Sequence, residues 1–161
     1  MVLATNLGFP RIGVDRELKK ALEGYWKEKS SREELLATAR ELRLRHWKMQ
    51  KEAGIQHIPS NDFSLYDHVL DTACLLGCVP ERYGSKGDLD TYFAMARGDT
   101  KNPAMEMTKW FDTNYHYIVP ELEEGHKFKL SGTKIFDEYE EAKKAGIVTR
   151  PVLLGPISFL M

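Results

Sequence analysis

The sequence predicts an α/β fold in which short strands alternate with helices. Two observations support this prediction: apolar segments of strand length recur along the chain, and a polar loop followed by a helical segment comes after the first two of them. Parallel strands need crossover helices, so the alternation favours a parallel sheet. About four such units fit in the 161 residues, whereas a closed eight-stranded barrel needs on the order of 250.

The first third of the chain contains one strand candidate and two helix candidates. Residues 2–13 read as a strand that opens into a loop, and residues 16–23 as a helix. Ser31 precedes Glu34 by three residues, the spacing of a reciprocal capping box at the start of a longer helix. Gly54 is placed to end that helix. Its predicted apolar stripe consists of Leu35, Ala39, Leu42, His46, Met49 and Ala53.

The middle of the chain repeats the same order. Residues 55–58 form a second strand candidate, and a polar loop separates them from a helix predicted between Leu65 and Gly77. Residues 92–96 are predicted to be helical. Residues 110–119 are rich in aromatic side chains, and their pattern leaves helix and strand both open.

The last segments complete the pattern. Residues 135–145 are predicted to form a charged amphipathic helix closed by Gly146, and residues 152–154 a buried strand. The apolar run at 157–161 has no polar tail or helix after it. We therefore expect the sequence to be cut from a longer chain.

Composition argues against several classes of partner. The chain has 23 basic and 24 acidic side chains and a net charge of −1, so no general field attracts nucleic acid or an anionic membrane. No apolar run has the length of a membrane span, and the first residues lack a secretory pattern, so we expect a cytoplasmic protein. Four basic residues are expected on the solvent side of a helix: Arg40, Arg43, Arg45 and Lys48.

The two cysteines, Cys74 and Cys78, stand in the string CLLGC and would share one face of a helix. A zinc site would need two more ligands, and only His68 is close in the sequence. We therefore interpret the cysteines as small buried helix residues. Neither a disulfide framework nor export is expected.

Five long strings resemble one known family. They are LGFPRIG at 7–13, RELKKALEGYW at 16–26, IPSNDFSLYDHVLD at 58–71, EMTKWFDTNYHYIVPEL at 106–122 and TRPVLLGPISFL at 149–160. In this order they are similar to the N-terminal region of the cobalamin-independent methionine synthases. The resemblance implies that residues 1–161 are roughly the first half of that family's N-terminal, folate-binding (β/α)8 barrel of the TIM type.

The resemblance also implies an activity for the parent enzyme. Two face-to-face barrels transfer a methyl group from 5-methyltetrahydropteroyltri-L-glutamate to L-homocysteine, giving methionine, without cobalamin. Zinc holds the homocysteine thiolate, and its His, Cys, Glu and Cys ligands belong to the C-terminal barrel. By this resemblance the catalytic barrel and its zinc ligands are absent from this chain, which we expect to be inactive alone. Cys74 and Cys78 match none of the ligand motifs.

The family's N-terminal barrel helps to bind the glutamate tail of the folate. The matching positions are Arg16, Glu17, Leu18 and Lys19 of RELK, and Lys109 and Asn114 of EMTKWFDTNYHY. Arg16 and Lys19 would be one helical turn apart, and arginine grips a carboxylate through two bonds while lysine acts as a mobile point charge. Glu17 cannot bind a carboxylate when ionised, but it can orient a lysine.

The second group of candidates lies in the aromatic stretch. Lys109 precedes Trp110 and Phe111, so its charge would lie beside apolar walls where salt screens it less. Asn114 can donate and accept, which suits a pterin or amide edge. The aromatic side chains themselves are interpreted as core, and Lys19 would otherwise be an ordinary solvated lysine.

Three hypotheses follow for the function. The chain is an inactive piece of a zinc-dependent methyltransferase, a stand-alone module that binds folates or other polyanions, or a scaffold fragment without a ligand. Replacing Lys19 and Lys109 would change only solubility in the third case.

Half a barrel leaves two open sheet edges, and open edges pair readily with other chains. We therefore predict that the chain self-associates. Sedimentation at high protein concentration checks this prediction, and a monodisperse monomer would contradict it.

Overall fold

The computed structural model describes residues 2–84 and 88–161, which form two compact units. Unit 1 comprises Met1–Leu65 and Ile135–Leu153, and unit 2 comprises Tyr66–Lys134 and Leu154–Met161. The architecture is mixed α/β. Within the described ranges there are two sheets of two strands each, and neither is closed. In the same ranges, no helix is long and apolar enough to cross a membrane.

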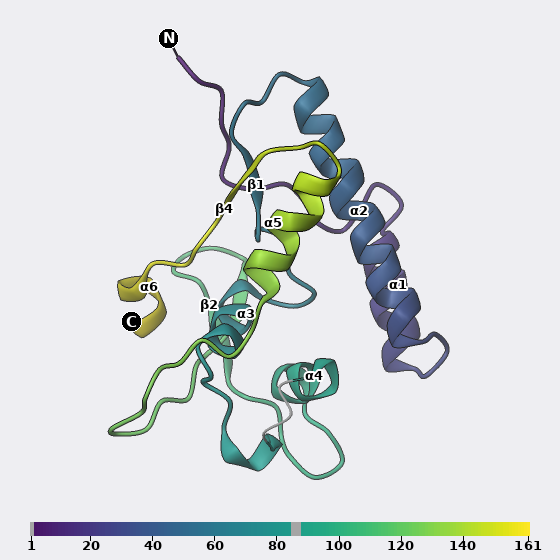
Figure 1. Ribbon diagram of the computed structural model, residues 1–161. Helices are drawn as coiled ribbons and strands as arrows, with labels where there is room; N and C mark the ends of the chain where they lie inside the picture. Colours follow the sequence, from purple (N-terminus) through teal and green to yellow (C-terminus); the bar gives the residue numbers. More distant parts are fainter. Residues whose placement is uncertain (1, 85–87) are drawn as a thin grey trace. The chain divides into compact units, whose positions relative to one another are not determined.

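Figure 1 shows the elements in chain order. The helices are α1 (Glu17–Trp26), α2 (Arg32–Glu52), α3 (His68–Leu75), α4 (Leu89–Arg97), α5 (Lys134–Lys144) and α6 (Pro156–Leu160), with a 3-10 turn, η1, at Glu81–Tyr83. The strands are β1 (Ile58–Ser60), β2 (Met107–Lys109), β3 (His116–Ile118) and β4 (Thr149–Pro151).

Unit 1 is built on a parallel pair of strands. β1 and β4 lie side by side with Ile58 opposite Thr149 (Figure 1). Helices α2 and α5 supply the apolar cover, because Trp47 and Ala142 pack with Ile58 and Ile147 in one buried cluster. The indole of Trp47 also donates to the carbonyl of Pro59 at 3.0 Å, which ties α2 to β1. The predicted parallel pairing is therefore present.

Helix α2 begins and ends where the sequence predicts. The Ser31 hydroxyl accepts from the Glu34 amide at 3.2 Å, and the Glu34 carboxylate accepts from the Ser31 amide at 2.7 Å, so the capping box is complete. Gly54 follows the helix with φ +82°, a conformation that favours glycine. Both signals are local in sequence, which is why the pattern reveals them.

The predicted apolar stripe of α2 is right only in its first part. The stripe residues are buried as far as His46, but Met49 is 47% exposed and Ala53 is exposed. Trp47 and Gln50 are buried instead. The buried face turns because the end of α2 packs over β1, where the large indole fills the space.

A buried carboxylate closes the loop after β1. Glu138 of α5 is 4% exposed, and it accepts from the Asn61 amide at 2.9 Å. Asn61 has φ +58°, so this bond holds a left-handed turn directly after the strand. Arg43 lies 3.9 Å from Glu138 and 2.7 Å from Glu141. The prediction that Arg43 faces solvent is therefore wrong, because a buried carboxylate requires a counterion.

Three predicted strands need correction. The strand predicted at residues 55–58 begins only at Ile58 and runs to Ser60. The strand predicted at residues 2–13 is reduced to a single parallel bridge between Thr5 and His57. The Thr5 hydroxyl donates a hydrogen bond to the His57 carbonyl at 3.2 Å. The strand predicted at 152–154 is also wrong, since β4 ends at Pro151 and Leu153 is 64% exposed. The pairing of β4 with β1 is accompanied by a buried hydrogen bond in which the Thr149 hydroxyl donates to the Ser60 hydroxyl at 2.9 Å. An apolar pattern cannot indicate such a polar pair.

Unit 2 is built on α3 and an antiparallel hairpin. In β2 and β3, Met107 lies opposite Ile118 and Lys109 opposite His116. The ambiguous stretch at 110–119 is therefore the turn and second strand of a hairpin. The core of the unit consists of Val69, Ala73, Cys78 and Phe159, with Leu76, Trp110, Tyr117 and Leu154 packed against it.

Helices α1, α4 and α5 agree with the predictions in type, although α1 runs from Glu17 to Trp26 where 16–23 was predicted. Helix α6 was not predicted and lies in the apolar run near the end of the sequence. Residues 92–96 lie within α4, and α5 differs from its predicted bounds by one residue at each end. Helix α3 is shorter than predicted and begins after Asp67, whose side chain accepts from the Leu70 amide.

The cysteines do not share a helical face, because α3 ends at Leu75 and Cys78 lies beyond it. Burial raises the pKa of the Cys74 thiol to about 12, and burial also raises the pKa of Cys78. Both side chains are therefore thiols at neutral pH. Their interpretation as buried residues fits Cys78, which is 1% exposed, and Cys74 is half-buried.

We predict that Glu138→Ala lowers the free energy of unfolding by roughly 2–4 kcal/mol, because it removes the buried acceptor of the Asn61 amide and leaves Arg43 with Glu141 as its one remaining carboxylate partner in the described part of the chain. Glu140→Ala on the same helix is the matched control, since Glu140 forms an exposed pair with Lys143, and it should change the free energy by less than about 0.5 kcal/mol. Urea denaturation followed by circular dichroism measures both. Equal effects would contradict the role given to Glu138.

Candidate functional site

The RELK residues form the start of α1, and Arg16 stands at its N-cap. Arg16 is exposed and has φ +58° and ψ +37°, a left-handed conformation that is unfavourable for arginine. Within the described part of the chain, no side chain caps α1. Contacts with neighbouring residues must therefore stabilise this left-handed conformation, and the residues that make them come before and after Arg16 in the sequence.

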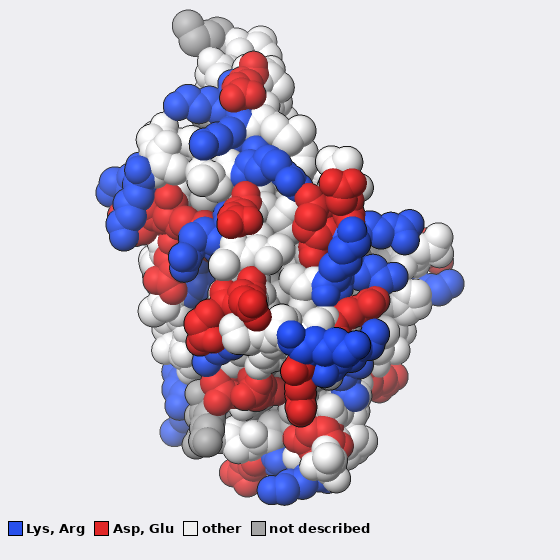
Figure 2. Space-filling model, turned by 90° about the vertical axis from the view of Figure 1, so that its right-hand side faces the viewer, with Lys and Arg blue, Asp and Glu red and all other residues white. Residues whose placement is uncertain are grey.

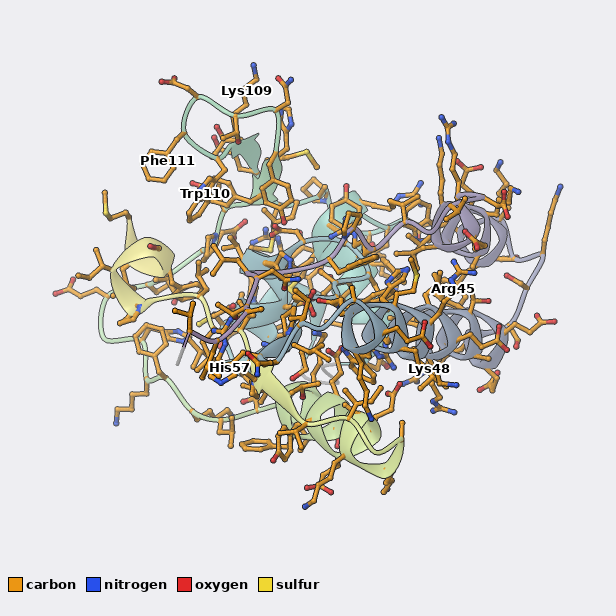
Figure 3. All side chains as sticks on the ribbon, turned by 90° about the horizontal axis from the view of Figure 1, so that it is seen from above. Arg45, Lys48, His57, Lys109, Trp110 and Phe111 are labelled. Atoms are coloured by element: carbon orange, nitrogen blue, oxygen red, sulfur yellow. The ribbon has the colours of Figure 1, made fainter. Side chains whose placement is uncertain are left out.

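Glu17 supplies part of that support. Its carboxylate accepts from the Asp15 amide at 3.0 Å and from the Arg45 guanidinium at 2.7 Å. Arg45 belongs to α2, and Figure 3 shows it between α2 and α1. The hydrogen bond from Arg45 holds the pKa of Glu17 below its ordinary value. Glu17 therefore braces the start of α1 and stays ionised at neutral pH.

The remaining two RELK side chains face opposite environments. Leu18 is fully buried, and its amide donates to the carbonyl of Ile12 at 3.1 Å. The side chain of Lys19 is 56% exposed, with its ammonium 3.8 Å from Glu23. Arg16 and Lys19 are thus exposed cations at the N-terminal end of α1. Glu17 and Leu18 stabilise that end of the helix through their contacts within the fold.

Lys109 and Asn114 both lie on the hairpin of unit 2 and are exposed. In Figure 3 the side chain of Lys109 extends outward beside Trp110 and Phe111. The Asn114 carbonyl lies 3.0 Å from Nδ1 of His116, the residue that pairs with Lys109 across the hairpin. These two candidates therefore share one short element.

The aromatic side chains of the hairpin divide between core and surface. Trp110 and Tyr117 pack edge to face with ring centroids 5.4 Å apart, and both contact the core of unit 2. Their interpretation as core is confirmed. Phe111 is 71% exposed and has φ +49°, so the core interpretation is wrong for this residue. The tight turn directs its ring away from the core.

The two groups of candidates belong to different compact units, and each is placed only within its own unit. On the face drawn in Figure 2, described basic and acidic side chains alternate. This agrees with the balanced net charge, and it means that any attraction for an anion acts over short distances.

Sequence reasoning missed Arg45 as part of this site. It placed Arg45 among solvated helix residues, whereas the structure pairs it with Glu17. The partners stand 28 residues apart, and nothing in the spacing of a basic helix indicates such a contact. Among residues 2–84 and 88–161, no group of three or more His, Cys, Asp or Glu side chains is arranged to hold a metal ion.

We predict that Arg45→Met, which replaces the aliphatic part of the side chain but removes the guanidinium and its charge, raises the pKa of Glu17 toward its ordinary value. A lowered folded-state pKa stabilises the fold above the unfolded-state value, and this stability is lost as pH falls through the folded-state pKa. NMR titration of the carboxyl carbon measures the shift. Arg40→Met on the exposed side of the same helix is the control and should leave Glu17 unchanged.

Comparison with known proteins gives a consistent result. The family model described as "Cobalamin-independent synthase, N-terminal domain" matches residues 3–161. A 5-methyltetrahydropteroyltriglutamate-homocysteine methyltransferase from Salinibacter ruber is 56% identical over 173 residues, which cover all of this chain and 22% of the relative. A protein of the same name from Parvibaculum lavamentivorans is 59% identical over 166 residues, covering 99% of this chain and 22% of its own.

A relative from Schizosaccharomyces pombe, named as a probable enzyme of the same kind, is 56% identical over 172 residues, covering 99% of this chain and 22% of the relative. The chain thus spans about a fifth of the length of these proteins. Because the family model matches almost the whole chain, the chain belongs to the cobalamin-independent methionine synthase family, in which it matches the N-terminal domain.

Proposed function

We propose that this chain is part of an enzyme that transfers a methyl group from 5-methyltetrahydropteroyltri-L-glutamate to L-homocysteine, and that its own contribution is to bind the glutamate tail of the folate. The observation that carries the proposal is the identity of 54–59% across nearly the whole chain to proteins named for this reaction. By the proposal, methyl transfer itself takes place outside residues 1–161.

The proposal extends to the fold. We infer that residues 1–161 form roughly the first half of a (β/α)8 barrel of the TIM type. The parallel pairing of β1 with β4 and the parallel bridge between Thr5 and His57 support this inference. In such barrels the substrate site lies at the carboxyl ends of the strands. Asn61 follows β1 at that end, and its side chain amide donates to the Val152 carbonyl at 2.8 Å.

The chemistry of the exposed cations supports binding of a polyglutamate tail. A triglutamate presents several carboxylates along an extended chain, and Arg16, Lys19 and Lys109 are exposed and positively charged. Glu17 and Leu18 contribute by fixing the start of α1, and Asn114 supplies an amide. Each exposed ion pair contributes only about 0.2–1 kcal/mol, so the preference for a longer tail should be moderate and sensitive to salt.

Zinc belongs to the parent enzyme in this proposal. The described residues do not fit a zinc ion, since none of their His, Cys, Asp and Glu side chains form a suitable group of three or more. The thiols of Cys74 and Cys78 also have raised pKa values, whereas zinc binds thiolates. No step assigned to this chain passes through a metal.

The test is calorimetric titration of this chain with 5-methyltetrahydrofolate that carries one or three glutamates. We predict tighter binding of the triglutamate, and loss of up to about fivefold of that preference in Lys19→Ala or Lys109→Ala. Raising the salt concentration should have the same effect as either substitution.

Lys144→Ala is the control, because Lys144 is exposed at the end of α5 and has no role in the proposal. Equal binding of the two folates by the unaltered chain would refute tail binding. A preference that survives both Lys19→Ala and Lys109→Ala would assign the tail to other residues.

A further inference from the structure

One buried side chain ties the β2–β3 hairpin to the start of α3. Asp67, the N-cap of α3, is 1% exposed. Its Oδ2 accepts from the Leu70 amide at 2.8 Å and from the Ile118 amide at 3.1 Å. Its Oδ1 accepts from the Tyr115 hydroxyl at 2.6 Å. A helix cap needs only the first of these bonds, and the other two reach the hairpin.

Neighbouring groups support the same arrangement. The Tyr115 hydroxyl also accepts from the His68 amide at 3.2 Å, in the first turn of α3. The Tyr92 hydroxyl accepts from the Asp67 amide at 3.3 Å and donates to Asp71 at 2.7 Å. The carboxyl of Asp67 acts as acceptor in all three of its bonds, and it lies at the N-terminal end of α3, where backbone amides are available as donors.

Strand pairing within the hairpin connects Lys109 to the residues that Asp67 binds. Lys109 lies opposite His116 in the ladder. The two hairpin residues that donate to Asp67, Tyr115 and Ile118, stand before and after His116 in the sequence. Asn114 precedes them directly. A two-stranded hairpin is marginally stable by itself, so its orientation depends on such anchors.

We propose that Asp67 is a positioning residue. It holds the hairpin in one orientation and so fixes the place from which Lys109 and Asn114 meet the glutamate tail. This inference rests on the proposed function of Lys109. Asp67 itself touches no ligand, since its carboxylate is buried and occupied by its three donors.

Asp67→Ser separates the two roles of the side chain. Serine is a good N-cap and can accept from the Leu70 amide, but its single hydroxyl is too short to serve β3 as well. Asp88→Ser is the matched control, because Asp88 caps α4 in the same unit through its bond to the Thr91 amide. Tyr115→Phe is a second, milder variant that keeps the ring and the cap.

The first measurement is amide hydrogen exchange of this chain without ligand. In Asp67→Ser, the amides of β2 and β3 should exchange roughly tenfold faster or more relative to those of α4, because both hydrogen bonds from the hairpin to Asp67 are lost. Tyr115→Phe should give a smaller increase at the same amides, and Asp88→Ser should give none there. Unchanged exchange in the hairpin of both Asp67→Ser and Tyr115→Phe would overturn the inference.

The second measurement is the ratio of affinities for the triglutamate and monoglutamate folates. Asp67→Ser should lower this ratio by up to about fivefold, as expected for one exposed ion pair, and leave the monoglutamate affinity unchanged. In a Lys109→Ala background it should have no further effect on the ratio, because the two residues act through one contact. An equal loss for both folates, or a further loss in that background, would reduce Asp67 to a purely structural role.

The two measurements distinguish this inference from the proposed function. If the unaltered chain binds both folates equally, or if Lys109→Ala leaves their ratio unchanged, the proposed function of Lys109 fails. Hydrogen exchange then decides alone whether Asp67 orients the hairpin. Tyr115→Phe provides both measurements if Asp67→Ser does not fold.

Discussion

The structure depends on carboxylates that satisfy backbone amides outside regular ladders. Among the described residues, each of the four strands is three residues long, so most backbone amides must find their acceptors outside the strand ladders. Side chains from distant segments accept from them: Glu138 from Asn61, Asp62 from Phe9, and Asp67 from Ile118. A buried amide without an acceptor is costly, and these bonds therefore decide which segments lie together.

The same constraint gives the RELK residues different surroundings. Glu17 accepts from the Asp15 amide and from Arg45, and Leu18 is fully buried, so neither side chain is available to an anion. Arg16 and Lys19 keep their charges at the surface. The proposed tail site uses this arrangement, because the pair between Lys19 and Glu23 is exposed and therefore weak, so a carboxylate of the ligand can compete for the lysine.

The features that the sequence predicted correctly depend on residues close to one another in the chain. The capping box of Ser31 and Glu34 and the glycine after α2 lie within one helix, and the pattern identifies both. The start of β4 depends on hydroxyls that are 89 residues apart, and the brace of Glu17 depends on a partner in another helix. No periodicity records such contacts. The candidate site residues came from the resemblance of whole strings, since exposed lysines carry no pattern of their own.

The division of the chain into units has a consequence for its synthesis. The longer segment of unit 2, residues 66–134, lies in the sequence between the two segments of unit 1, so β1 is made long before its partner β4. On the ribosome, residues 1–65 must wait for the whole of 66–134 and then for α5 before Glu138 reaches the Asn61 amide. Contacts between such distant segments form slowly, and domains made early are exposed meanwhile. Unit 2 has to wait as well, because Phe159 of its core and Leu154 beside it are made after β4. Neither unit can therefore complete its packing until the last residues of this sequence have been made.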